Sequence, residues 1–307
     1  MIEVQQAQLV FSFPEVHHQA HLKVTFVRTL RIPDDGRDYP LPAGLGHFPI
    51  RHVDDYGQNV PAAWRERGGV MFPMFQSEAL WLKFDSDYPF ALKVAAGKIN
   101  AASGEPWRTG LHRDPQDYLV IPDQPWLDGY AIEKGFIRQF VAEPLGLGMT
   151  AEEQITGKAE FGGIQLAAFP MKRAAYQHHF PPPPQLMPSD DIHFSMRDIT
   201  CESASMGLAA GGRMRQEIYE DDYELSDWDT ESTSRCFVHL CNSMVWRQIT
   251  GSEPPTVPPT AKEYAKAGMP WFEYYNDACK PLPGSPTLAK LKSVGEIKQT
   301  GSIHSQE

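Results

Sequence analysis

Cys236, His239 and Cys241 form the spacing C-x-x-H-x-C, which comes nearer to a metal site than any other pattern in this chain. A zinc site needs three or four nitrogen, sulfur or oxygen ligands that converge on the ion. The surrounding residues predict a β-strand, in which side chains alternate between two faces. Cys236 then points away from His239 and Cys241, so only two ligands converge, and no C-x-x-C pair follows elsewhere. We interpret the two cysteines as core residues and predict no metal site.

A glycine-rich segment is the strongest candidate for binding a small anion. Its candidate ligand-binding residues are Gly207, Gly211, Gly212, Arg213 and Arg215. Glycines let backbone amides approach a ligand, and the two arginines would add positive charge. The segment matches neither a Walker loop nor G-x-G-x-x-G, and it leads into a strand rather than a helix. A glycine-rich β-turn or bulge is the structural alternative.

Cys201 lies just before the glycine-rich segment and is a candidate nucleophile, with His193 or His239 as the base. The recognised nucleophile and metalloprotease patterns, G-x-S-x-G, S-x-x-K with its partners and H-E-x-x-H, are absent from the sequence. A hydrolase-like or metal-assisted enzyme with a cleft at 201–215 therefore stands as the alternative hypothesis.

Two further groups of side chains are of types that bind metals. The first combines imidazoles with a carboxylate pair, which together could form a site for a divalent metal. The imidazoles are those of His17, His18, His21, His178 and His179, and the carboxylates are those of Asp54 and Asp55. The second is an acidic run with carboxylates at alternating positions, which suits calcium: Glu220, Asp221, Asp222, Asp227, Asp229 and Glu231. The run lacks the glycine of an EF-hand loop, and histidines in loops are ordinarily solvated. We interpret both groups as polar surface, and the sequence identifies no cofactor.

Composition bounds the class of protein. The 307 residues are 41% apolar and 22% charged, which is typical of a globular chain, and the formal net charge is −11. This charge repels phosphates, so we predict no nucleic-acid binding. No apolar stretch is long enough to span a membrane, the first residues do not resemble a signal peptide, and the four cysteines are few. We therefore predict no membrane insertion and a cytoplasmic location.

The 27 prolines cut the chain into short elements. Alternating apolar residues predict strands at 21–32, 70–75, 79–84, 90–95, 98–102, 118–121, 129–133, 136–142, 164–169, 192–199, 213–219 and 235–240. Short helices are expected at 150–157 and after Thr260, each with a capping box, and from Asn242 or Ser243 through Ile249. Strands and helices do not alternate as they do in a parallel α/β sheet.

The fold class predicted from these elements is mainly β, an antiparallel β-sandwich-like architecture with several short helices and Pro-rich loops. We expect a single integrated domain at 1–294 and a flexible tail at 295–307. Four consecutive prolines at 181–184 make a sub-boundary at 177–190 an alternative.

The blocks GFIRQFVAEPLGLGMTAEEQITG, GLAAGGRMRQEIYED, SRCFVHLCNSMVWRQITG and AGMPWFEYYND resemble a family of bacterial and fungal proteins with no assigned activity. The similarity spans most of the chain. It implies one architecture across the proline-rich break, and it implies no cofactor and no catalytic residue.

Two functional hypotheses follow from the sequence. The first is a non-enzymatic binding or assembly protein, with a protein partner or a second copy of the chain as its target. Its basis is the β surface, the aromatic segments QPWLDGY and GMPWFEYY, and the lack of a complete catalytic pattern. The aromatic segments either anchor loops on the core or line an apolar cleft. The alternative is the enzyme with its site at 201–215.

Overall fold

The structure is a computed structural model that describes residues 1–181, 205–258, 260–266, 269, 271–272, 276 and 278–304. Its strands are β1 (Ile2–Gln5), β2 (Gln8–Ser12), β3 (His21–Thr29), β4 (Asp38–Tyr39), β5 (Leu41–Pro42), β6 (Gly44–His47), β7 (Arg51–His52), β8 (Val70–Met74), β9 (Ala79–Asp85), β10 (Phe90–Ala96), β11 (Ile99–Asn100), β12 (Leu119–Ile121), β13 (Trp126–Leu127), β14 (Gly129–Glu133), β15 (Phe136–Pro144), β16 (Ile164–Pro170), β17 (Ser205–Arg215), β18 (Ser234–Asn242) and β19 (Trp271–Phe272). Its helices are η1 (Asp54–Asn59), α1 (Ala62–Arg67), α2 (Ala151–Thr156), α3 (Arg173–His179), η2 (Leu225–Asp227), α4 (Ser243–Thr250), α5 (Ala261–Lys266), η3 (Leu288–Lys290) and α6 (Val294–His304).

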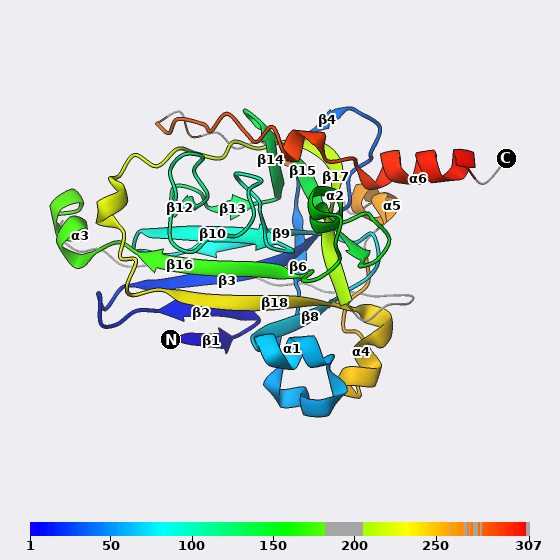
Figure 1. Ribbon diagram of the computed structural model, residues 1–307, viewed down its shortest axis with the longest axis horizontal. Helices are drawn as coiled ribbons and strands as arrows, with labels where there is room; N and C mark the ends of the chain where they lie inside the picture. Colours follow the sequence, from blue (N-terminus) through cyan, green and yellow to red (C-terminus); the bar gives the residue numbers. More distant parts are fainter. Residues whose placement is uncertain are drawn as a thin grey trace.

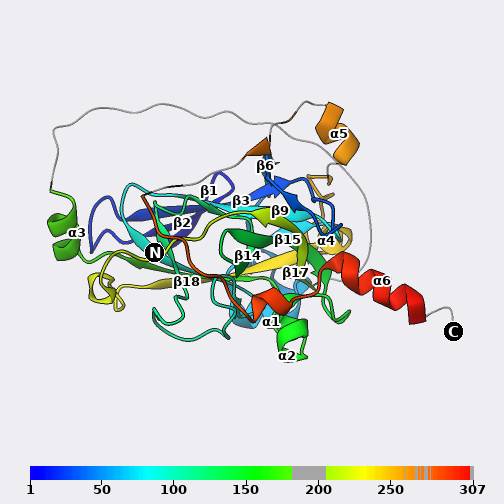
Figure 2. The same cartoon turned by 90° about the horizontal axis from the view of Figure 1, so that it is seen from above.

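The mainly β prediction is confirmed, with 39% strand and 19% helix. Hydrogen-bonded pairing is antiparallel through most of the sheet, and β4 and β8 run parallel to β17 and β18. The helices are short and lie around the sheet, with α3 at one end and α6 projecting at the other (Figure 1). Figure 2 shows the same separation of these two helices from above.

The sheet folds into two layers at two corners. One layer contains β2, β3 and β9, and the other contains β18, β16, β10 and β12. The long pair β15 and β17 joins them, and in Figure 1 it runs across the direction of β10, β16 and β18. At each corner the described chain shows two residue pairs between the strands: β9 with β15, and β17 with β18. These short connections let the sheet turn while the backbone stays hydrogen-bonded.

The main core lies between the layers and follows the predicted alternation. Leu22, Val24 and Phe26 of β3 are fully buried on the inner face. Thr25 and Val27 on the other face of β3 are buried as well, which the alternation does not predict. Arg28, which shares the face of Phe26, is 2% exposed and forms an ion pair with buried Glu78. Both faces of β3 are therefore covered along its second half.

Helix α2 begins and ends as the sequence predicts. The Thr150 side chain accepts a hydrogen bond from the Glu153 amide, and the Glu153 carboxylate accepts from the Thr150 amide. Gly157 ends the helix with a positive φ of 71°. This capping box satisfies amides that the first turn of a helix leaves free.

Helix α6 covers residues 295–304 of the tail predicted at 295–307, and the flexibility of this tail stays a prediction. A capping box between Ser293 and Glu296 starts this helix, and the Asp34 carboxylate accepts from the Gly295 amide. The polar composition suggested a frayed end, but local caps and a carboxylate from a distant loop stabilise the first turn.

Strands on the two sides of the proline-rich break pair directly, β15 with β17 and β16 with β18. The suggested sub-boundary at 177–190 begins within α3 and continues beyond the described residues. The strand predicted at 192–199 also lies outside them.

Candidate functional site

The glycine-rich segment is not a loop but the middle of β17. Gly207, Gly211 and Gly212 are all buried there, and the strand bulges opposite Arg138 and Phe140. The expectation that this segment begins a strand only at Arg213 is therefore wrong, whereas the bulge interpretation agrees with the structure.

Close packing explains these glycines. A Cβ on Gly212 would lie 2.4 Å from the Pro33 carbonyl oxygen, and one on Gly211 would lie 2.6 Å from a methyl of Val141. A Cβ on Gly207 would meet Thr150 at 2.9 Å. The glycines leave room for neighbouring chain segments, so the segment has no open cradle of amides for an anion.

Arg213 is already engaged by acidic neighbours. Its guanidinium forms ion pairs with Asp38, at 2.6 Å from Nε to Oδ1, and with Glu133. The same group lies 4.0 Å from the centroid of the Phe136 ring. Arg215 is exposed at the end of the strand. The structure thus does not bring the two arginines together with the glycines into one site.

The catalytic candidates are not assembled in the part of the chain that the structure describes. Cys201 and His193 lie outside it. His239 is 1% exposed and is stacked between Trp64 and Phe237, with each ring centroid 4.7 Å away. Its Nε2 lies 3.0 Å from the Gly68 carbonyl oxygen, and burial lowers its pKa to about 4. This histidine is a core residue.

The two strand cysteines lie on opposite faces, as the alternation predicts. Cys236 belongs to the main core, whereas Cys241 packs in a second cluster with Trp64 and Trp246. Burial raises the pKa of each thiol to about 12. Among the described residues no group of three or more His, Cys, Asp or Glu side chains is placed to hold a metal ion.

The other polar groups are dispersed over local contacts. His17 is stacked on Tyr88, and His179 lies 3.0 Å from an Asp227 carboxylate oxygen. Asp229 accepts two backbone amides of its own turn. Asp221 differs from the solvated acidic loop that the sequence suggests, because it is 8% exposed and lies at the wall of a cleft.

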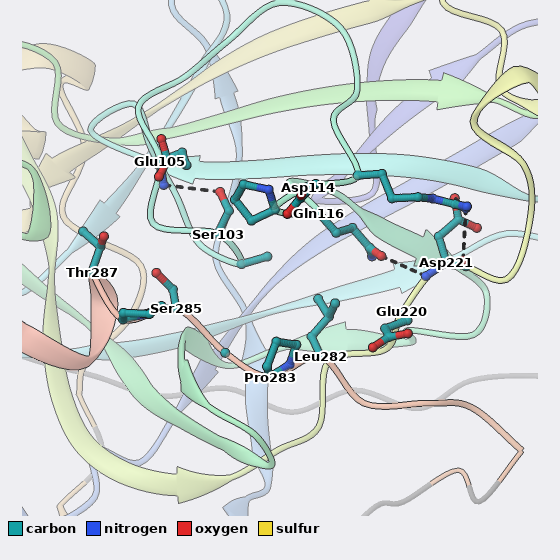
Figure 3. Close-up of a pocket in the computed structure, with 15 residues that line it drawn as sticks. Ser103, Glu105, Asp114, Gln116, Glu220, Asp221, Leu282, Pro283, Ser285 and Thr287 are labelled. Atoms are coloured by element: carbon teal, nitrogen blue, oxygen red, sulfur yellow. Dashed lines mark hydrogen bonds and ion pairs between the residues drawn. The ribbon is translucent and has the colours of Figure 1, made fainter.

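This cleft is the strongest candidate site that the described residues form. It has a volume of about 580 Å³ and lies between segments 102–105, 113–116, 220–221 and 282–287 (Figure 3). The last two segments come from beyond the proline-rich break, so the cleft combines distant parts of the chain. Its size falls within the range of small-molecule sites.

The Asp221 carboxylate connects several residues that form one wall of the cleft. Its carboxylate accepts the Tyr118 hydroxyl at 2.6 Å and the Trp228 indole N–H at 2.9 Å, and it pairs with Arg113 at 3.2 Å. The Tyr223 amide supplies a further donor. Burial, followed by the hydrogen bond to Asp221, raises the pKa of Tyr118. These donors use the hydrogen-bonding capacity of the Asp221 carboxylate, so this side chain stabilises the wall of the cleft.

A buried lysine anchors the neighbouring loop. Lys93 Nζ lies 2.6 Å from the Asp117 carboxylate, and it also donates to the carbonyl oxygens of Arg108 and Gly110. The same carboxylate lies 2.9 Å from Nδ1 of His112. All three ammonium protons therefore have acceptors, and loop 108–117 is held against β10.

Backbone hydrogen bonds hold the 282–287 wall of the cleft in place. The Leu282 amide donates to Ile218, and the Ser285 amide donates to Ala131. Gly104, with φ of 73°, sits directly under this wall, because a Cβ there would lie 2.5 Å from Ser285 Oγ. The facing segments are thus in contact at the base of the cleft.

Several polar side chains of the lining keep unused hydrogen-bonding capacity. Within the described part of the chain, the carboxylates of Glu105 and Asp114 receive no hydrogen bond or ion pair. The buried hydroxyls of Ser103 and Ser285 each accept one backbone amide and donate to no described residue. Glu220, by contrast, is paired with Lys280.

The described residues of the two aromatic segments QPWLDGY and GMPWFEYY lie in different parts of the structure. Trp126 is half-buried and its ring lies 6.2 Å from that of Trp81. Trp271 is 42% exposed and lines a second, largely apolar groove of about 450 Å³ with Tyr264 and Leu30. No described residue of either segment lines the acidic cleft.

Sequence reasoning missed Glu105, Asp114 and the 282–287 segment. The signal in the sequence nearest to the site is the acidic run at 220–222, whose carboxylates also suit calcium. Single acidic residues in loops carry no periodicity, and their convergence depends on loop conformation rather than on spacing.

Comparison of the chain with protein-family models, with curated proteins and with solved structures finds no match. The resemblance to a bacterial and fungal family therefore stays a prediction. None of the described helices is both long and apolar enough to cross a membrane.

Proposed function

We propose that the protein is a non-enzymatic binding protein and that the acidic cleft is its ligand site. This proposal rests on a difference in hydrogen bonding among the polar side chains that line the cleft. Asp221 and Gln116 are saturated by structural hydrogen bonds, whereas Glu105 and Asp114 have none in the described chain. A preformed wall with unused polar groups suits the recognition of a small polar molecule.

The glycines around 207–212 are packed inside β17 and His239 is buried, so these residues do not support the enzyme alternative. Cys201 and His193 lie outside the described residues, and the alternative stays a prediction. A protein partner or a homo-oligomer stays a prediction from the sequence, and so does the cytoplasmic location.

A thermal-unfolding screen tests the proposed function. The panel contains representatives of small amines, sugars, carboxylates and nucleotides, each at millimolar concentration. A ligand present at one hundred times its Kd stabilises the folded state by about 2.7 kcal/mol, so at least one class raises Tm. Incubation of that compound with the protein, followed by mass spectrometry, is expected to return it unchanged. Conversion to a product would instead indicate an enzyme.

The variant Gly104→Ala tests whether the ligand binds in the cleft. Its new methyl group would collide with Ser285 and displace the 282–287 wall, so the Tm rise should disappear. Gly135→Ala is the matched control, since Gly135 has a similar φ of 76° and open space around its Cβ position. Equal ligand responses in both variants, or no response to any class in the wild type, would refute the proposed function.

A further inference from the structure

We infer that the ligand of the acidic cleft is a small organic cation that carries primary amino groups. This inference rests on the proposed function and adds the chemical class of the ligand. It follows from which lining groups are free and which are already paired.

The free charge in the cleft is negative. Arg113 is occupied by Asp221 and by the carbonyl oxygen of Tyr223, and Lys280 by Glu220. The carboxylates of Glu105 and Asp114 are the acidic groups that remain. A ligand with protonated amines would neutralise them, whereas an anionic ligand would meet two charges of its own sign.

Two buried hydroxyls in the lining can contribute hydrogen bonds to the same ligand. Ser103 is 7% exposed and Ser285 is 3% exposed, and both line the cleft (Figure 3). Each hydroxyl accepts one backbone amide, at 3.3 Å in both cases. A hydroxyl has a second lone pair and a proton, so each keeps capacity for a ligand group. An ammonium group has three donors that can use the free lone pairs and the carboxylates together.

The described lining favours cations that donate hydrogen bonds. Quaternary ammonium groups are recognised by aromatic rings, and none of the described residues that line this cleft is aromatic. The apolar side chains here are those of Ala102, Leu282 and prolines, which suit a short carbon chain. A metal ion is not supported, because the described residues contain no group of three or more candidate ligands.

Isothermal titration with 1,4-diaminobutane tests the ligand class, with 1,4-butanediol as a neutral probe of the same length. We expect the diamine to bind and the diol not to bind. Raising the salt concentration should weaken diamine binding, because the carboxylates are partly exposed. The double variant Glu105→Gln with Asp114→Asn should bind the diamine about tenfold more weakly or worse, as the loss of two partly exposed ion pairs predicts.

The control is the double variant Asp55→Asn with Glu66→Gln. Both residues are exposed on η1 and α1, outside the cleft lining, and their loss changes the net charge of the protein by the same amount. An equal loss of affinity in the control would overturn the inference, because it would indicate attraction by overall charge alone.

The outcomes separate the two proposals. If a sugar or another neutral compound raises Tm in the screen, and Gly104→Ala abolishes this rise while the diamine does not bind, the inferred ligand class is wrong and the binding function stands. If neither the diamine nor any panel compound binds in a manner that Gly104→Ala abolishes, both proposals fail.

Discussion

Asp221 and Asp114 both line the cleft, yet their surroundings are opposite. Asp221 receives hydrogen bonds from Tyr118, Trp228 and the Tyr223 amide, and it has little capacity left for a ligand. Asp114 is exposed and receives none from the described residues. Both lie in polar stretches of sequence, so spacing alone does not distinguish a structural carboxylate from a binding one. The distinction depends on donors contributed by distant segments.

The buried ion pair of Lys93 and Asp117 gives a stability prediction. Lys93→Met would leave the Asp117 carboxylate, 3% exposed, without its ammonium partner. Removing one partner of a buried pair costs about 3–5 kcal/mol, and we expect a loss of this size in the free energy of unfolding measured with urea. Lys23→Met is the control, because its pair with Asp85 is about half exposed and should cost under about 1 kcal/mol. Equal losses would contradict the anchoring role of Lys93.

Asp128 gives a prediction for pH dependence. Burial raises its pKa from 3.8 to about 7, although a hydrogen bond from Gln216 opposes this shift. Between about pH 4 and pH 7 the folded protein holds a proton that the unfolded chain has released. The stability contribution of Asp128 is therefore complete below about pH 4 and decreases as the pH rises to about 7.

Asp128→Asn should remove this decrease, since an amide does not titrate. We expect the variant to lose less stability than the wild type across that range, where one displaced proton changes the free energy of unfolding by up to about 1.4 kcal/mol per pH unit. Urea unfolding at a series of pH values measures the slope. Identical slopes in the two proteins would show that the carboxyl group is not buried as described.

At the scale of elements, most strands could be predicted and β17 could not. The apolar alternation at 79–84, 90–95 and 164–169 predicts β9, β10 and β16 to within one residue at each end. Glycines are depleted in strands, so the glycine-rich segment suggested a loop instead. In the structure the segment bulges, and residues 32–33 cross closely over it. That crossing is a tertiary contact with no local signal.

The close approach over β17 predicts the effect of substitution there. Gly212→Ala would place a methyl group 2.4 Å from the Pro33 carbonyl oxygen, and backbone does not move aside easily. Overpacking of this kind costs about 1–3 kcal/mol, which urea unfolding would detect. Gly211→Ala should cost less, because its nearest obstacle is the Val141 side chain. The reverse order would contradict the packing explanation of these glycines.

At the scale of the whole molecule, the sequence predicts the mainly β class but not the cleft. Period-two patterns and frequent prolines suffice for the class. The cleft requires segments 102–116, 220–221 and 282–287 to meet, and this depends on the two sheet corners and on anchors such as Gln116, which bonds across to Tyr219 and Asp221. None of these segments is a regular element. The net charge of −11 agrees with an acidic site for a cationic ligand but does not locate it.

A crystal structure of the protein with saturating 1,4-diaminobutane would locate the ligand. We expect the diamine in the cleft, with its nitrogen atoms within hydrogen-bonding distance of the Glu105 and Asp114 carboxylates and of the Ser103 or Ser285 hydroxyl. Diamine bound only elsewhere, or an empty cleft in crystals whose packing leaves it open, would contradict this expectation.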